Sequence, residues 1–174
     1  MDETMRSALW GQFGAAIDML GNAIDACPDD AWADDAWVDD GRQAEFWAVA
    51  FHTLFWLDLY LSPTREGFAP PAPFGLEELS YDGRPPRAYT KDEVRAYLTH
   101  CRAKCWTVID TLTTESAAET RPIGRIEGSV LEMLLYNLRH VQHHAGQLNL
   151  MLRQATGTDA PRWVSRAIGE PAGA

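Results

Sequence analysis

The sequence predicts an all-α fold, a four-helix bundle with a long crossover connection between its second and third helices. Four segments carry apolar residues at helical spacing or are apolar nearly throughout. No segment shows the clear alternation of a half-buried strand, and the stretch between the second and third segments is long enough to cross the bundle. The 174 residues suit a single domain spanning 1–174, because 46% are hydrophobic and 23% charged.

The first two helices are predicted at residues 3–27 and 43–61. The first carries apolar residues at helical spacing and stops before Pro28. The second is apolar nearly all round, which indicates a buried helix, and it stops before Pro63. Residues 63–89 then hold six of the ten prolines. Loops of this length in compact domains tend to be lids or binding segments, so we expect this one to cover a site.

The third and fourth helices are predicted at residues 91–113 and 130–154. Thr90 caps the third helix, and Glu93, three residues further on, completes a capping box. Ser129 caps the fourth helix after a short glycine-containing linker. Both starts are therefore marked by side chains that satisfy the free backbone N–H groups of a first helical turn.

Two further segments lie outside the helices. Residues 29–40, with the sequence DDAWADDAWVDD, lack the alternating Asp spacing and twelfth-position Glu of a calcium loop. We interpret them as an acidic loop that packs Trp32 and Trp37 on the bundle. The tail, residues 157–174, is rich in Gly, Pro and Ala, and we expect residues 162–164 (Arg-Trp-Val) to pack back on the helices.

Charge and composition exclude several classes of function. A formal net charge of -10 argues against binding nucleic acid or anionic membrane, because both need clustered Lys and Arg. The most apolar segment, residues 46–61, is shorter than the roughly 20 residues of a membrane span. The start shows no secretory signal, and the three cysteines form no disulfide framework. These features predict a cytoplasmic protein with reduced thiols.

The histidines give the strongest functional signal. On a helical wheel His140 and His144 lie one turn apart, roughly 100° and 60° from the centre of the apolar stripe, while His143 points outward. Two imidazoles at this spacing can hold one metal ion from one helix. His52 is the natural third ligand, because an imidazole in the middle of a buried helix needs a partner. Glu45, two turns earlier on the same face, is a candidate for orienting the His52 ring.

Three neutral imidazoles with open coordination positions suit a divalent transition metal, zinc or nickel. Other catalytic patterns fail on particular residues: the zincin HExxH motif needs Glu where Val141 stands, and no Glu lies three residues ahead of a histidine as di-iron bundles require. Cys101 and Cys105 lie in an apolar stripe, which favours packing over chemistry. His100 has no visible partner, and we assign it no role.

The segment from Asn137 to Gln147, with the sequence NLRHVQHHAGQ, resembles the last-helix motif of the DinB/YfiT-like superfamily. In that family a third histidine projects from the second helix, which His52 matches. Helix order and length are also similar, so the resemblance covers roughly residues 3–155. It implies a metal-binding four-helix bundle, often dimeric, that holds zinc or nickel, and it carries over His52, His140 and His144 as ligands.

The resemblance also implies activities for this chain. Family members with assigned activity include transferases and isomerases that act with low-molecular-weight thiols. We therefore expect a homodimeric metal-dependent enzyme that activates a small thiol or water against a small electrophilic substrate. Two alternatives stay open: a metal-dependent hydrolase, and a non-catalytic helical dimer in which the metal is structural or vestigial. The catalytic residues themselves are not predicted.

Overall fold

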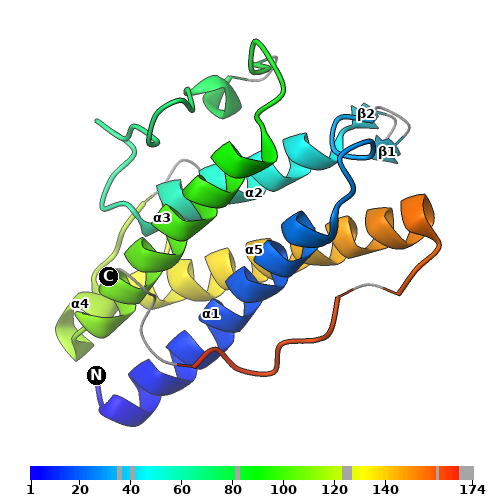
Figure 1. Ribbon diagram of the computed structural model, residues 1–174. Helices are drawn as coiled ribbons and strands as arrows, with labels where there is room; N and C mark the ends of the chain where they lie inside the picture. Colours follow the sequence, from blue (N-terminus) through cyan, green and yellow to red (C-terminus); the bar gives the residue numbers. More distant parts are fainter. Residues whose placement is uncertain (35–36, 40–41, 81–82, 123–126, 160, 169–174) are drawn as a thin grey trace.

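The computed structural model describes residues 1–34, 37–39, 42–80, 83–122, 127–159 and 161–168, and of residues 37–39 and 42–44 it describes the backbone only. The predicted all-α, four-helix bundle is confirmed (Figure 1). Its four long helices are α1 (Glu3–Ala26), α2 (Phe46–Leu61), α3 (Lys91–Asp110) and α5 (Val130–Thr156).

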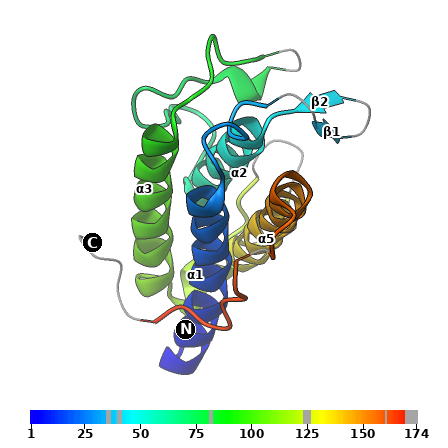
Figure 2. The same cartoon turned by 45° about the vertical axis from the view of Figure 1, so that its right-hand side comes forward.

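The helices form a ring in which α1 and α2 each pack mainly against α3 and α5 (Figure 2). The end of α1 meets the starts of both α2 and α3. The Trp47 N–H donates to the Trp32 carbonyl at 3.1 Å, and the Trp32 indole N–H donates to the Tyr89 carbonyl at 2.8 Å. Residues 62–90 therefore lead the chain back from the far end of α2 to the end where α3 begins.

The predicted helix starts are confirmed by capping geometry. Thr90 and Glu93 form a capping box at α3, with the Thr90 side chain accepting from the Glu93 N–H. Ser129 and Glu132 form a second box at α5. Gly157 ends α5 with φ of 66°, a left-handed conformation that glycine adopts without a steric penalty. Local sequence thus sets where α5, which carries His140 and His144, begins and ends.

The expectation of no strand was wrong for the segment before α2. β1 (Trp37–Asp39) pairs antiparallel with β2 (Arg42–Ala44), and α2 begins at Phe46 instead of residue 43. Chain already paired as a strand cannot join a helix, which explains the later start. The Trp32 side chain packs on the bundle as predicted and is 7% exposed. The prediction for Trp37 lies outside the described side chains.

The third helix also ends earlier than predicted. α3 stops at Asp110, because Thr113 caps a further short helix, α4 (Thr114–Ala118), and its side chain accepts from the Ser116 N–H. In the part of the chain that the structure describes, no helix combines the length and apolar character needed to cross a membrane.

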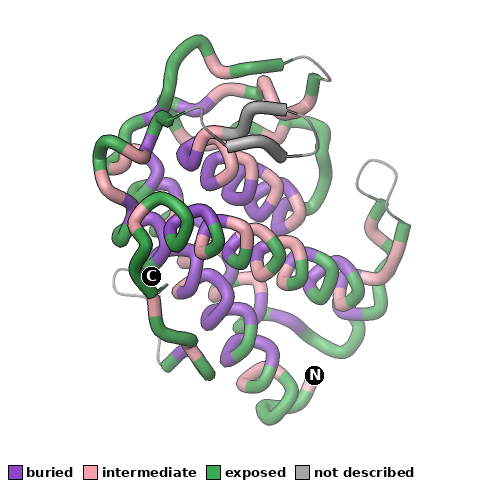
Figure 3. Tube along the Cα trace, turned by 90° about the vertical axis from the view of Figure 1, so that its right-hand side faces the viewer, coloured by how far each residue is buried: buried purple, intermediate pink, exposed green. Residues whose placement is uncertain are grey.

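The core lies between the inner faces of the helices, where Figure 3 shows the buried residues. The stripe predicted on α5 is confirmed: all its members are buried except Leu138, which is half-buried. Cys101 and Cys105 of α3 are fully buried in this core, as their spacing indicated. The buried members of the α5 stripe are Val130, Leu134, Val141, Ala145, Leu148 and Leu152.

Aromatic side chains fasten the connection between α2 and α3 to the bundle. Phe74 is buried and stacks on Tyr97 of α3, with ring centroids 4.5 Å apart. Phe68 packs edge-on against Phe55 of α2 at 5.4 Å. A short 3-10 helix, η1 (Glu77–Leu79), follows in the same connection. The predicted covering segment is therefore a packed part of the fold.

The tail returns along α1, as Figure 1 shows in red. The Ala167 N–H donates to the Gly11 carbonyl at 2.9 Å, and a Cβ at Gly14 would lie 2.6 Å from the Cβ of Ala167. Val164 packs against the core as predicted, but Trp163 stays 69% exposed. The tail is held by this backbone pairing and by hydrogen bonds from the Arg166 guanidinium to Ser7, and not by the Trp163 ring.

Candidate metal centre

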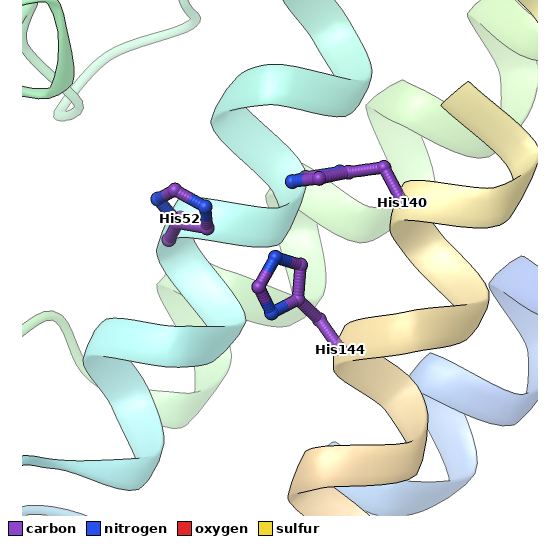
Figure 4. Close-up of side chains that lie close together, drawn as sticks. All are labelled: His52, His140 and His144. Carbon is purple, nitrogen blue, oxygen red and sulfur yellow. The ribbon is translucent and has the colours of Figure 1, made fainter. Parts of the chain in front are cut away.

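Two packed helices bring three histidines together. His52 lies midway along α2, and His140 and His144 lie one turn apart on α5. The three rings project into the space between the two helices (Figure 4). Ring centroids lie 5.5 Å apart for His52 and His140, 4.9 Å for His52 and His144, and 4.5 Å for His140 and His144. One ligand nitrogen of each lies within 4.8 Å of the others.

The remaining histidines lie outside this cluster. His143 is exposed on α5 as predicted, with its ring centroid 5.0 Å from that of His144. His100 of α3 does have a partner, contrary to expectation, because its Nε2 lies 3.6 Å from a carboxylate oxygen of Asp58. Asp58 is buried between α2 and α3, so this contact is separate from the three-histidine cluster.

The His52 ring is oriented by a residue that the sequence reasoning missed. Glu78 of η1 places its Oε2 atom 2.7 Å from Nδ1 of His52. The prediction that Glu45 orients this ring is wrong. Glu45 instead forms an ion pair with Arg84, whose guanidinium nitrogen lies 2.7 Å from a Glu45 carboxylate oxygen. Glu45 immediately precedes α2, and its carboxylate turns toward Arg84 in the connection between α2 and α3. Glu78 belongs to η1 in the same connection, which places it over the middle of α2. Because a carboxylate oxygen accepts, this contact favours Nδ1 as the donor, and in the neutral ring the lone pair is then on Nε2.

His144 is oriented from within its own helix. Its Nδ1 lies 2.6 Å from Oε1 of Gln147, three residues further along α5. Because an amide oxygen can only accept, this contact also favours Nδ1 as the donor, and in the neutral ring the lone pair is then on Nε2. Metal-binding histidines typically donate their other ring N–H to such an acceptor.

His140 is held neutral by its surroundings. Burial, followed by the neighbouring rings of His144, His52 and His143, lowers the pKa of its imidazole from 6.5 to about 3. Among the described residues, its buried Nδ1 atom has no hydrogen-bond partner. A neutral imidazole is the form that binds a metal ion, so the site favours the protonation state that a ligand needs.

Aromatic side chains form one wall of the cluster. The ring centroid of Tyr60 lies 6.0 Å from that of His140, and Trp56 lies 6.3 Å from His52. Trp56 and Tyr60 contact each other, and Tyr60 contacts Tyr136 of α5. Burial, followed by the nearby Tyr136 hydroxyl, raises the pKa of Tyr60 above its usual value. Tyr60 therefore keeps its hydroxyl proton at neutral pH.

The donor set fits a divalent transition metal. Imidazole is a common ligand of zinc and nickel, and the three rings come from two rigid helices. Nitrogens that share one tetrahedral zinc ion would lie about 3.4 Å apart, so these atoms, which lie within 4.8 Å of one another, would need to approach by at most about 1.4 Å.

Comparison with known families agrees with the geometry. The family model described as the DinB superfamily matches residues 12–148, most of the chain. The chain belongs to the DinB superfamily. The matched region includes all three clustered histidines of this DinB-superfamily protein. A search of curated proteins finds no match.

The two orienting residues differ in how far the sequence could reveal them. Gln147 lies three residues after His144, a spacing that places both side chains on one helix face. Its position alone could have indicated a contact. Glu78 lies in an irregular, proline-rich connection with no periodicity, so only the folded chain reveals its contact with His52.

Proposed function

We propose that this DinB-superfamily protein binds zinc or nickel through His52, His140 and His144 and activates a small thiol or water against a small electrophilic substrate. The observation that carries the proposal is the convergence of three imidazoles from two helices. Within the described residues, the cluster has three candidate ligands, one fewer than a closed structural zinc site requires. This count supports open coordination and hence catalysis.

A divalent metal with open coordination lowers the pKa of a thiol or water that binds it, so it supplies a nucleophile near neutral pH. The protein residues hold and shield the site. Glu78 and Gln147 orient two of the imidazoles, and burial keeps His140 neutral. Trp56 and Tyr60 exclude water from one side, which strengthens electrostatic interactions within the site.

Metal binding is tested with protein purified without a polyhistidine tag and equilibrated with zinc or nickel. Native mass spectrometry then reports bound metal and subunit number together, and so also tests the predicted homodimer. We expect stoichiometric metal in the native protein and its loss in His140→Ala. His143→Ala is the matched control, since His143 is exposed on the same helix and should leave metal content unchanged. A native protein that takes up no metal contradicts the proposal.

The catalytic proposal is separated from a structural or vestigial metal by access to the site. In cobalt-loaded protein, adding cysteine as a thiol probe should change the visible absorption spectrum if a coordination position is open. An unchanged spectrum at saturating cysteine indicates a closed, structural site. Turnover of a small electrophile that requires the added thiol supports a transferase or isomerase, and turnover without it supports the hydrolase.

A further inference from the structure

We infer that Glu78 is a positioning residue that fixes the His52 ring with its proton on Nδ1 and its Nε2 lone pair available to the cluster. This inference rests on the proposed metal site and adds to it a residue from outside the helices. Glu78 belongs to η1, in the connection between α2 and α3, and so ties the position of that connection to the geometry of the site.

Two contacts define the position of the Glu78 carboxylate. Its Oε2 atom lies 2.7 Å from Nδ1 of His52 and 3.1 Å from Nε1 of Trp56. His52 and Trp56 lie one turn apart on α2, so a single oxygen bridges two side chains of the same helix face. The indole N–H can only donate, which leaves the oxygen as acceptor in both contacts.

The connection holds Glu78 in place independently of His52. Phe74, four residues earlier, is buried and packs against Phe51 and Tyr97 at centroid distances of 5.6 and 4.5 Å. After η1, Arg84 pairs with Glu45 beside the start of α2 at 2.7 Å. The Glu78 side chain itself is only 18% exposed. Anchors on both sides of η1 therefore present its carboxylate to α2.

This arrangement has a consequence for metal binding. Without an acceptor at Nδ1, the His52 proton is free to move to Nε2, where it blocks the atom that would bind the metal. The ring also becomes free to rotate. Removing comparable partners of metal-binding histidines lowers metal affinity about 10–100-fold, and we expect a loss in this range for Glu78→Ala.

The tautomer is measured directly in the metal-free protein from the side-chain nitrogen chemical shifts of His52, assigned with a His52→Gln variant. We expect the Nδ1–H form in the native protein and a shift toward Nε2–H in Glu78→Ala. Glu78→Gln keeps an oxygen that can accept from Nδ1 while removing the negative charge, so it should retain the native tautomer. Glu66→Ala removes the same charge from an exposed position of the same connection and serves as the control.

Metal affinity of the same variants is measured by competition with a chelator. The inference is overturned if Glu78→Ala binds metal with native affinity or keeps the native tautomer of His52. This reading requires that the variant shows a cooperative thermal unfolding transition. If Glu78→Ala does not fold, Glu78→Gln decides: Nε2–H at His52 in that folded variant overturns the inference, and Nδ1–H supports it. A native protein that binds no metal refutes the proposed function, whereas the tautomer measurement still decides the role of Glu78.

Discussion

The Nδ1 atom of His144 and the Oε1 atom of Gln147 lie 2.6 Å apart on α5. This contact is local, since both residues belong to one helix and three positions separate them. His52 is instead oriented by the carboxylate of Glu78, which belongs to a distant segment of the chain. Two of the three imidazoles thus have an Nδ1 partner that orients them in the metal-free chain, which would lower the ordering cost of the proposed metal site.

Replacing Gln147 should weaken metal binding without abolishing it. We expect Gln147→Ala to lower the affinity for zinc about 10–100-fold, because the His144 ring loses the acceptor that fixes its tautomer. Gln147→Glu keeps an acceptor at the same reach and should retain most of the affinity. Chelator competition measures both. Gln154→Ala, at an exposed position near the end of α5, is the control, and an equal loss there would argue against a specific role for Gln147.

Acid should destabilise the metal-free protein through His140. Its pKa is lowered from 6.5 to about 3 by burial and neighbouring histidines. Between these values the unfolded chain binds a proton that the folded chain does not, so stability falls as the pH is lowered through this range. The loss is about 1.4 kcal/mol per pH unit, or about 2 kcal/mol between pH 6.5 and 5.

Urea denaturation of metal-free native protein and of His140→Gln, each at pH 7 and pH 5, tests this prediction. Both proteins share the acid response of the other groups, so the difference between them isolates His140. We expect the native protein to lose more stability than His140→Gln over this interval. The same pH dependence in both proteins would mean that His140 is protonated as readily in the folded state as in the unfolded state.

Most of the fold could be predicted because its signals are local. Thr90 and Ser129 mark helix starts through side chains that bind their own first turn. The hairpin before α2 was missed because its strands span three residues each, too short for periodicity to show. The Asp40-Gly41 dipeptide between them, typical of tight hairpins, was the available signal.

The residues of the candidate site differ in the same way: those with a local sequence signal were predicted, and the one that depends on tertiary packing was not. His52, His140 and His144 were found because helical spacing places a residue on a face before any tertiary contact is known. Glu78 was not found, because its place over α2 depends on the packing of an irregular connection. Glu45 was a reasonable expectation from spacing, yet it precedes the first turn of α2 and pairs with Arg84.

The ion pair between buried Asp58 of α2 and partly exposed Lys104 of α3 should matter more for stability than the exposed pairs. Asp58 is 1% exposed and accepts from Lys104 Nζ and from the Tyr97 hydroxyl at 3.0 Å. Lys104→Met leaves this carboxylate without its main partner, and we expect a loss of up to about 3 kcal/mol in the free energy of unfolding, because Lys104 is partly exposed and the Tyr97 hydroxyl still donates. Lys104→Met combined with Asp58→Asn should recover part of this loss, because no charge is then left unpaired.

The comparison for that experiment is an exposed pair, Arg95 of α3 with Asp25 of α1, whose nitrogen and oxygen atoms lie 2.6 Å apart. Arg95→Met should cost no more than about 1 kcal/mol, because water screens and competes for exposed charges. Urea denaturation measures all the variants. If Lys104→Met costs as little as Arg95→Met, the Asp58 carboxylate must find another partner, for which His100 at 3.6 Å is the nearest candidate.

The three cysteines should be unreactive in the folded protein. Cys27, Cys101 and Cys105 are all buried, and burial raises the pKa of each thiol, to about 11 for Cys27. Because the thiolate is the reactive form, we expect negligible reaction with dithiobis(nitrobenzoate) at pH 8 in native protein and three thiols per chain in denaturant. Thr107→Cys, at an exposed position of α3, should add one thiol that reacts rapidly in the folded state. Rapid labelling of Cys101 or Cys105 in native protein would instead show that α3 separates from the core on the timescale of the reaction.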